Sequence, residues 1–266
     1  MPAVSSTPSL PMSTDSTPRV AVVTGGSRGL GRSTVLALAA RGVRSIFTYH
    51  SNEAAADEVV AATREAGAEG VALQLDTSDT AQFAGFADHV RAALEDLGAD
   101  HVDYLVNNAG TGYHAPIEET TEDAFDHLYR IHLKGPFFLT QTLLPLMAEG
   151  GRIVNLSSGL ARFSFPGSSA YASMKGAVEV LTRYQARELA ERGITANVVA
   201  PGAIETDFGG GRVRDDAGLN QQVASMTALG RAGVPEDIGP MIAALLSDAN
   251  RWVTGQRIEA SGGMLL

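Results

Sequence analysis

The sequence predicts a doubly wound α/β fold: a single domain whose parallel sheet of about seven strands carries helices on both faces. Strand-like and helix-like segments alternate from residue 19 to the end of the chain. The strand-like segments are mostly continuous apolar runs, as expected of parallel strands that are buried on both faces. No change in composition after residue 19 marks a second domain.

The individual elements follow in order along the chain. "RVAVVT" (19–24) is the first expected strand, and a glycine-rich turn leads from it into a helix over 32–42. Apolar runs predict further strands at 44–50, 70–76, 102–107, 151–158, 193–202 and 256–260. Helices are expected at 52–67, 79–97, 121–148, 169–192 and 235–247, the last after a loop of roughly 30 residues. The helix from 169 has serine N-cap candidates and an alanine-rich start.

Composition excludes several classes of function. The chain of 266 residues is 44% hydrophobic and long enough for one large core. Its net charge of −10 argues against a nucleic-acid partner. The absence of cysteine excludes disulfides, thiolate catalysis and cysteine-ligated zinc. The histidines show no metal-ligand spacing, so no metal is expected.

Residues 1–18 are rich in Ser, Thr and Pro, and we expect a disordered tail before a domain spanning 19–266. This segment does not resemble a signal peptide, because it has no basic start and no apolar run. No stretch approaches the roughly 18–20 apolar residues that a membrane helix needs. A cytoplasmic location without membrane contact is therefore expected.

"TGGSRGLG" (24–31) predicts a nucleotide-binding turn, because it follows a strand and opens a helix. Gly25, Gly29 and Gly31 would let a pyrophosphate approach the free N–H groups of the helix N-terminus. Acids that bind the ribose hydroxyls of NAD commonly end the second strand, yet no acid occurs there before Glu53. Arg28 could pair with a 2′-phosphate, so the turn favours NADP(H) over NAD(H).

Two alternatives remain for this assignment. Arg28 could be a solvated loop charge, and Arg44 could compete for the 2′-phosphate. NAD(H) would then stay possible as the cofactor.

The motifs "TGGSRGLG", "NNAG", "NLSS", "YASMK" and "PGAIET" occur in this order and with matching spacing. Together they resemble the short-chain dehydrogenase/reductase superfamily over residues 19–263, and most closely its 3-oxoacyl-(acyl-carrier-protein) reductase type. The resemblance implies a Rossmann fold, hydride transfer between NADP(H) and a ketone or secondary alcohol, a small-molecule substrate, and a homodimer or homotetramer.

The resemblance also implies roles for individual residues. Ser158, Tyr171 and Lys175 match the family's catalytic residues, with Tyr171 and Lys175 also touching the cofactor. Asp76 matches the acid that holds the adenine amino group. The remaining expected cofactor contacts are Gly25, Ser27, Arg28, Gly29, Leu30, Gly31, Tyr49, His50, Ser51, Thr77, Asn108, Ala109, Gly110, Pro201, Gly202, Ile204 and Thr206.

The chemistry of this residue set can be derived from physical principles. A free phenol has a pKa of about 10, and the nearby Lys175 ammonium together with the positively charged oxidised nicotinamide would lower it toward the working pH. Tyr171 would then act as general acid in reduction and as general base in oxidation. Ser158 would donate a hydrogen bond to the carbonyl oxygen. The alternative is a chance Tyr-x-x-x-Lys pair on a surface helix.

His132 departs from the family pattern, which often has an asparagine there that helps to hold a water in a proton relay. Histidine can bind a water and shuttle protons near pH 7, although His132 could merely pack in the helix. A broken relay leaves room for a dinucleotide-binding sensor or scaffold without turnover.

Loops and surfaces complete the expectations. Residues 203–230 are expected to form a flexible substrate loop, with Gly209–Gly211 as hinges of a lid. His114 could touch the substrate or lie in a surface loop. Apolar faces of the helices over 121–148 and around Tyr171 are expected to bury against a partner subunit. Aromatic residues expected near the mouth of the pocket are Tyr113, Phe163, Phe165 and Phe208.

Overall fold

The protein is described by a computed structural model, which covers residues 18–266. The expected disordered tail therefore lies outside the described residues, apart from Pro18. The described chain forms one seven-stranded sheet with the order β3-β2-β1-β4-β5-β6-β7, and all neighbouring strands are parallel. The predicted single-domain doubly wound fold is confirmed. The strands are β1 (Val20–Val23), β2 (Arg44–Tyr49), β3 (Gly70–Gln74), β4 (Val102–Asn107), β5 (Met147–Leu156), β6 (Thr195–Pro201) and β7 (Arg257–Ala260).

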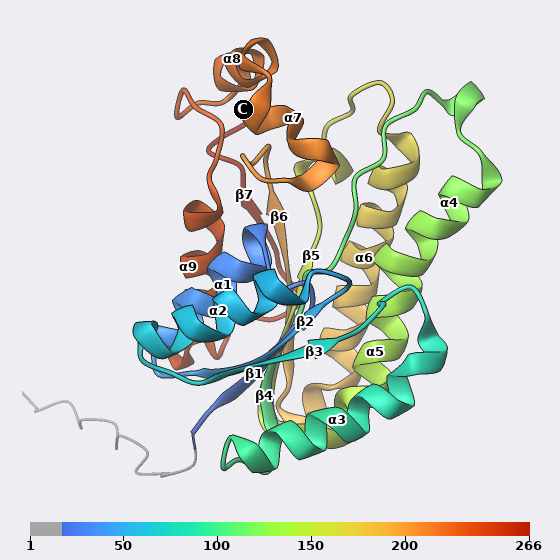
Figure 1. The fold of residues 1–266 in the computed structure, drawn as a ribbon. Coiled ribbons are helices and arrows are strands. Elements are labelled where there is room, and N and C mark those ends of the chain that lie inside the picture. The colour runs from blue at the N-terminus through green and yellow to red at the C-terminus, as the bar shows by residue number, and fades with distance from the viewer. Residues whose placement is uncertain (1–17) are drawn as a thin grey trace, which may run out of the picture.

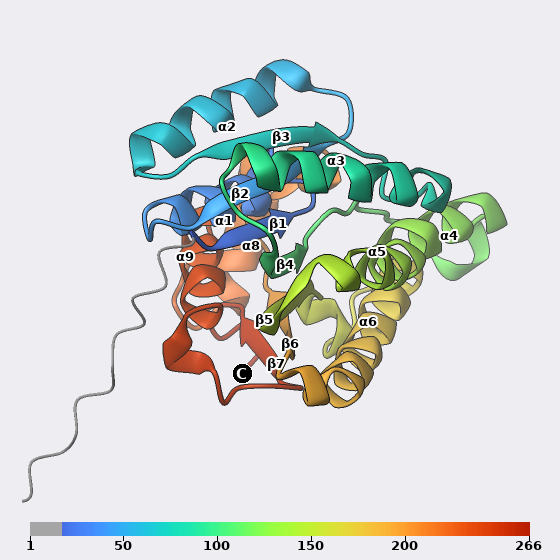
Figure 2. The ribbon, with the colours of Figure 1, turned by 90° about the horizontal axis from the view of Figure 1, so that it is seen from below.

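Helices cover both faces of this sheet (Figure 1). One layer contains α1 (Gly29–Ala39), α2 (Glu53–Ala66) and α9 (Pro235–Leu245). The other layer contains α3 (Phe83–Asp96), α4 (Glu122–Tyr129), α5 (Gly135–Leu143) and α6 (Ser169–Glu188). Figure 2 shows the same two layers from below. Successive strand residues point to opposite faces, so Val20 and Val22 join one core cluster while Ala21 and Val23 join the other.

The strand order reverses direction between β1 and β4, which places the ends of these two strands beside a natural ligand crevice. The turn after β1 is tied to β4, because the Thr24 N–H donates to the Val106 carbonyl at 3.0 Å. The Asn108 side chain donates to the Thr24 carbonyl at 2.8 Å. These two hydrogen bonds hold the turn after β1 against the end of β4 at the switch point.

The prediction of one continuous helix over 121–148 is wrong, because the segment is divided into shorter elements. α4 ends at Tyr129, a π-helical turn spans Arg130–Lys134, and α5 begins at Gly135 with Pro136 in its first turn. A 3₁₀ turn (Leu144–Leu146) contains Pro145, which ends the helix, and β5 begins at Met147 rather than at 151. The apolar run continues through this boundary, so periodicity alone did not reveal it.

The segment expected as one loop also contains helices. A 3₁₀ turn (Phe208–Gly211), α7 (Arg212–Asp215) and α8 (Ala217–Met226) lie within it. Asp216 caps α8 by accepting bonds from the Gly218 and Leu219 N–H groups at 2.9 and 3.0 Å. In Figure 1, α7 and α8 lie above the carboxyl edge of the sheet. Within residues 18–266, no helix combines the length and the apolar character needed to cross a bilayer.

Candidate active site

The glycine turn after β1 has the geometry of an anion-binding helix start. Gly25 and Gly29 adopt φ values of +66° and +53°, which favour glycine. A side chain on Gly31 would collide with the Gly25 carbonyl, so this position needs glycine as well. Arg28 precedes α1 in an extended conformation, and its side chain makes no cap bond. The first N–H groups of α1 are therefore free to receive a pyrophosphate, and the turn fits a dinucleotide.

The end of β2 presents polar residues without an acid. Tyr49 ends the strand, and His50 and Ser51 are exposed beside it. The His50 ring lies 3.8 Å from a carboxylate oxygen of Asp76. Burial opposes the ionisation of Asp76, but bonds from the Ser78 N–H and hydroxyl outweigh it and lower the pKa.

Arg28 lies exposed at the carboxyl edge, where these residues gather. Arg44 lies at the other end of β2 and donates to the Leu97 carbonyl. The alternative that Arg44 takes the 2′-phosphate is therefore wrong, because the sheet separates it from the glycine turn.

The loop after β4 supports the glycine turn. Asn108 donates to the carbonyls of Thr24 and Gly25 at 2.8 and 3.1 Å, and the Thr24 hydroxyl accepts from the N–H groups of Asn108 and Ala109. Asn108 thus holds the turn through its side chain. Gly110 packs against His132, since a Cβ there would lie 2.7 Å from His132 Cε1.

The segment after β6 returns to the same edge. Thr206 lies over Gly29, with its methyl group 3.6 Å from the position of a Cβ there. Gly202 lies close to Ser261, and Ile204 pairs with Gly233 in an isolated bridge. The remaining predicted contacts lie in the same loops: Ser27 and Leu30 at the glycine turn, Thr77 after β3, and Pro201 at the end of β6.

Ser158, Tyr171 and Lys175 come together at the carboxyl end of β5. Tyr171 and Lys175 lie one turn apart on α6 and are both buried. Lys175 Nζ lies 5.5 Å from the centre of the Tyr171 ring and donates to the Leu156 carbonyl at 2.7 Å. Ser158 follows β5 and begins a 3₁₀ turn (Gly159–Ala161), and its side chain lowers the pKa of the neighbouring Tyr171 phenol.

The ionisation of this pair differs from the expectation. Burial raises the pKa of Tyr171, and the Ser158 side chain lowers it by a smaller amount, so the net shift is upward. The prediction that Lys175 lowers the pKa of Tyr171 is therefore wrong when only the protein's own groups act on it. Burial also lowers the pKa of Lys175 to about 7, so its ammonium is only partly formed at neutral pH.

His132 lies in the π-helical turn and is almost completely buried. Its Nε2 lies 2.8 Å from the Thr111 carbonyl oxygen and 3.4 Å from the Thr111 N–H, and the shorter contact favours a proton on Nε2. Its Nδ1 is buried without a partner in the described chain, and its ring packs edge-on against Tyr171 at 5.2 Å. Burial and Lys175 lower its pKa well below 6.5. This shift favours a neutral His132 near pH 7, and a relay role for it stays a prediction.

The substrate side of Tyr171 is aromatic. The Phe208 ring lies 5.8 Å from the Tyr171 ring. Tyr113 and Leu160 pack against a buried apolar cluster that includes Tyr171. The loops approach closely here, because a Cβ on Gly112 would lie 3.0 Å from Gly209 Cα. His114 is exposed and its ring lies against Gly167. Phe163 and Phe165 stack edge-on 5.7 Å apart.

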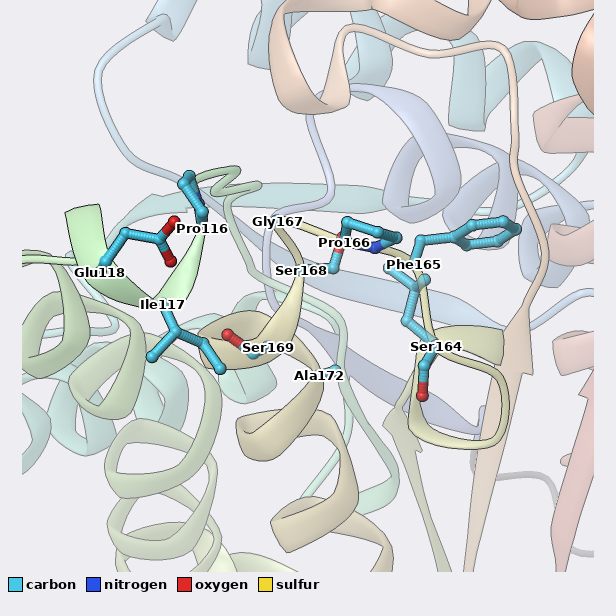
Figure 3. A pocket seen from close by; sticks show the side chains of 11 residues that line it. Pro116, Ile117, Glu118, Ser164, Phe165, Pro166, Gly167, Ser168, Ser169 and Ala172 are labelled. Carbon is cyan, nitrogen blue, oxygen red and sulfur yellow. The ribbon is translucent and has the colours of Figure 1, made fainter.

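An outer pocket of ≈ 330 Å³ adjoins this region through Leu160. Figure 3 shows Pro116, Ile117 and Glu118 on one side of it and the segment 164–169 on the other. Its wall is mainly apolar apart from Glu118 and the serines of this segment. This pocket offers room for part of a ligand bound beside Leu160.

Two contributors carry no sequence signal. Leu156 fixes Lys175 and Thr111 fixes His132, each through its backbone carbonyl. A side-chain motif cannot report a carbonyl, so only the fold reveals them. Across residues 18–266, no cluster of metal-ligating side chains is found.

The chain matches a family model described as "Enoyl-(Acyl carrier protein) reductase" over residues 25–265. The chain belongs to the short-chain dehydrogenase/reductase superfamily. It is 40% identical to an uncharacterized oxidoreductase of Methylorubrum extorquens over 92% of this chain and 97% of the relative. A tetrahydroxynaphthalene reductase of Pestalotiopsis fici is 35% identical over 92% of this chain and 91% of its own.

Solved structures agree with this short-chain dehydrogenase/reductase assignment. The promiscuous reductase LugOII, which catalyses keto-reduction at C1 during lugdunomycin biosynthesis, has a TM-score of 0.89 and 39% identity, covering 94% of this chain and 99% of its own. The angucycline C-6 ketoreductase LanV with bound NADP has a TM-score of 0.88 and 33% identity, covering 94% and 96%. The protein is therefore an oxidoreductase of a family that acts on carbonyl and alcohol groups.

Proposed function

We propose that this protein reduces a ketone on a fused aromatic ring system to a secondary alcohol with NADPH. The observation that carries this proposal is the buried Tyr171, whose ring centre lies 5.5 Å from Lys175 Nζ and beside Phe208 at the sheet edge that holds the glycine turn. Relatives named for hydroxynaphthalene and angucycline ketones support the ring system. They favour it over a 3-oxoacyl thioester.

The cofactor would occupy the carboxyl edge of the sheet. The Gly25–Gly31 turn would hold the pyrophosphate, Asp76 the adenine, and Arg28 the 2′-phosphate. The loops around Gly110 and Thr206 would flank the nicotinamide, and Lys175 would bond its ribose. When bound, NADPH supplies the hydride that reduces the carbonyl carbon.

Tyr171 would donate its proton to the carbonyl oxygen as negative charge develops there. Its raised pKa keeps the phenol protonated at neutral pH, which is the state that a general acid requires. Ser158 would donate a hydrogen bond to the same oxygen. Lys175, whose pKa is about 7, is already protonated in part of the molecules at neutral pH, and its ammonium would stabilise the phenolate as it forms.

A substrate panel tests the function. We expect turnover of a fused-ring ketone such as 2-tetralone, with kcat/KM about tenfold or more above that for acetoacetyl-CoA, and NADPH preferred to NADH. Tyr171→Phe should lower kcat by about 10²–10⁴-fold while NADPH binding, followed by fluorescence, persists. NADPH binding by the wild type without turnover of any ketone would instead support the sensor alternative. Full activity of Tyr171→Phe would overturn the mechanism.

We also propose that the protein is a homodimer or homotetramer. Large apolar side chains remain exposed on α4, α5 and α6, which cover one side of the sheet (Figure 1). A second subunit would bury them. These side chains are Phe125, Tyr129, Phe137, Phe138, Val180 and Tyr184.

A further inference from the structure

Arg257 on β7 and Glu179 on α6 form an ion pair directly behind Ser158. Arg257 Nε lies 2.7 Å from Glu179 Oε1, and their side chains are only 24% and 15% exposed. The same Glu179 oxygen accepts from the Ser157 hydroxyl at 2.7 Å. Arg257 also donates to the Ser158 carbonyl at 3.4 Å. The pair thus contacts both serines at the end of β5.

A second carboxylate anchors this pair from the C-terminal strand. Glu259 accepts from Arg257 at 2.9 Å and from Arg162 at 2.8 Å, and the Ser261 hydroxyl donates to it at 2.7 Å. Arg162 follows the 3₁₀ turn that Ser158 begins, and it also donates to the Met264 carbonyl at 3.1 Å. The segment around Ser158 is therefore held from both sides.

Ser158 needs such support because the regular ladder ends before it. β5 ends at Leu156, where it pairs with Val199 on β6. The Ser157 N–H still donates to the Val199 carbonyl at 2.7 Å, but Ser158 lies beyond that bond. Its position is set by the Leu160 N–H, which donates to its hydroxyl at 3.2 Å, and by the groups behind it.

Glu179 also lies on the helix that carries Tyr171 and Lys175, at successive four-residue steps. Residues at this spacing share one helix face. Through Glu179 and Arg257, the helix of the phenol is tied to the turn of the serine. Neither residue touches Tyr171, so their effect on it is indirect.

We propose that Arg257 and Glu179 are positioning residues that set Ser158 against Tyr171 for proton transfer to the ketone. This inference rests on the proposed function. It assigns a role to the C-terminal strand, which carries none of the expected catalytic residues. Small displacements of a reacting group can cost up to about 10²-fold in rate.

Arg257→Gln tests the inference in the full-length protein. We expect kcat for ketone reduction to fall about tenfold while KM for NADPH stays within about twofold. Ser158 lowers the pKa of Tyr171, so a displaced Ser158 should shift the pH profile of alcohol oxidation, where Tyr171 acts as base, to higher pH. A crystal structure of the variant should show a longer distance between Ser158 Oγ and the Tyr171 hydroxyl.

Matched variants separate positioning from folding. Glu179→Ala should cause a similar loss, and Arg257→Gln should add little in that background. Glu149→Gln removes a 2.8 Å ion pair with Arg192 far from Ser158 and should leave kcat unchanged. If Arg257→Gln fails to fold, Glu259→Gln replaces it, with a smaller loss expected.

The outcomes are distinct. If the wild type reduces ketones and a folded Arg257→Gln variant has the same kcat and pH profile, the positioning role alone would be overturned. Absence of ketone turnover in the wild type would overturn the proposed function, and the positioning role with it.

Discussion

At the scale of single residues, the site places ionisable groups where water cannot stabilise their charges. Tyr171, Lys175 and His132 are all buried. Burial raises the pKa of Tyr171 and lowers the pKa values of Lys175 and His132, so each shift favours the neutral form. A buried group resists charging until a partner charge appears beside it. The site therefore favours a neutral phenol before reaction and a phenolate only when Lys175 is charged.

Lys175 makes stability depend on pH. Its pKa is about 7 in the folded protein and 10.5 ordinarily, so the unfolded chain binds more protons between these values. The free energy of unfolding should therefore rise with pH across this window, by up to about 1.4 kcal/mol per pH unit. The raised pKa of Tyr171 acts oppositely above its ordinary value of 10.0. Urea unfolding from about pH 7 to about pH 10 measures this, and Lys175→Met should flatten the curve. An equally steep curve in that variant would contradict the assignment.

Arg28 should determine the choice of cofactor. Arg28→Ala should raise KM for NADPH by about 10–100-fold and leave KM for NADH within about twofold, since only NADPH carries the 2′-phosphate. Arg44→Ala is the control, because Arg44 lies at the opposite end of β2. Steady-state kinetics with both cofactors provide the measurement. Equal losses with both cofactors would contradict a phosphate-specific role.

His132→Asn should retain or raise activity. Asparagine can still donate to the Thr111 carbonyl and bind a water, while the ring contact with Tyr171 is lost. We expect kcat within about threefold of the wild type or higher, and a loss of about 1–3 kcal/mol in the free energy of unfolding from the cavity. His132→Leu, which cannot bond to Thr111, should lose activity. Collapse of His132→Asn would show that the histidine has another specific role.

At the scale of elements, the carboxyl edge is built from turns that approach one another closely. The loop after β4 contacts both the glycine turn and the 3₁₀ turn over Phe208–Gly211, and Phe208 lies beside Tyr171. Gly209, Gly210 and Gly211 adopt φ values of +61°, +78° and +75°, a conformation that other residues rarely adopt. Phe208 precedes these glycines, and its ring lies 5.8 Å from the Tyr171 ring.

Phe208→Ala should weaken binding of a fused-ring ketone. Loss of the ring that packs beside Tyr171 should raise KM for 2-tetralone by about 5–10-fold, with KM for NADPH unchanged. Leu229→Ala is a matched control from the same 203–230 segment, since Leu229 is 71% exposed. A lower KM in Phe208→Ala would instead mean that this ring obstructs the substrate.

At the scale of the whole molecule, the proposed self-association rests on the exposed aromatic residues of α4, α5 and α6. Tyr184→Glu combined with Phe137→Glu should shift the protein to monomers in sedimentation experiments, because charges would enter an apolar contact. Arg64→Glu on exposed α2 should leave the assembly unchanged. A wild-type protein that sediments as a monomer at micromolar concentration would contradict the proposed oligomer.

The sequence by itself determined the fold class, because strand segments alternate with helices and the continuous apolar run of most strands predicts burial on both faces. The expected strand at 102–107 coincides with β4, and the glycine turn leads from β1 into a helix as predicted, although α1 begins at Gly29 rather than at 32. The breaks at Tyr129 and Leu146 were missed, since the apolar pattern continues across them. Local periodicity reports burial, but not where a helix must bend to meet its neighbours.

Only the tertiary structure decided how the site is charged and held. The spacing of Tyr171 and Lys175 predicted their shared face, whereas the direction of the Tyr171 pKa shift depends on burial by residues distant in sequence. The Arg257–Glu179 pair joins positions 78 residues apart, and the carbonyls that hold Lys175 and His132 have no side-chain signature. Desolvation and long-range contacts are properties of the packed chain, so no local motif encodes them.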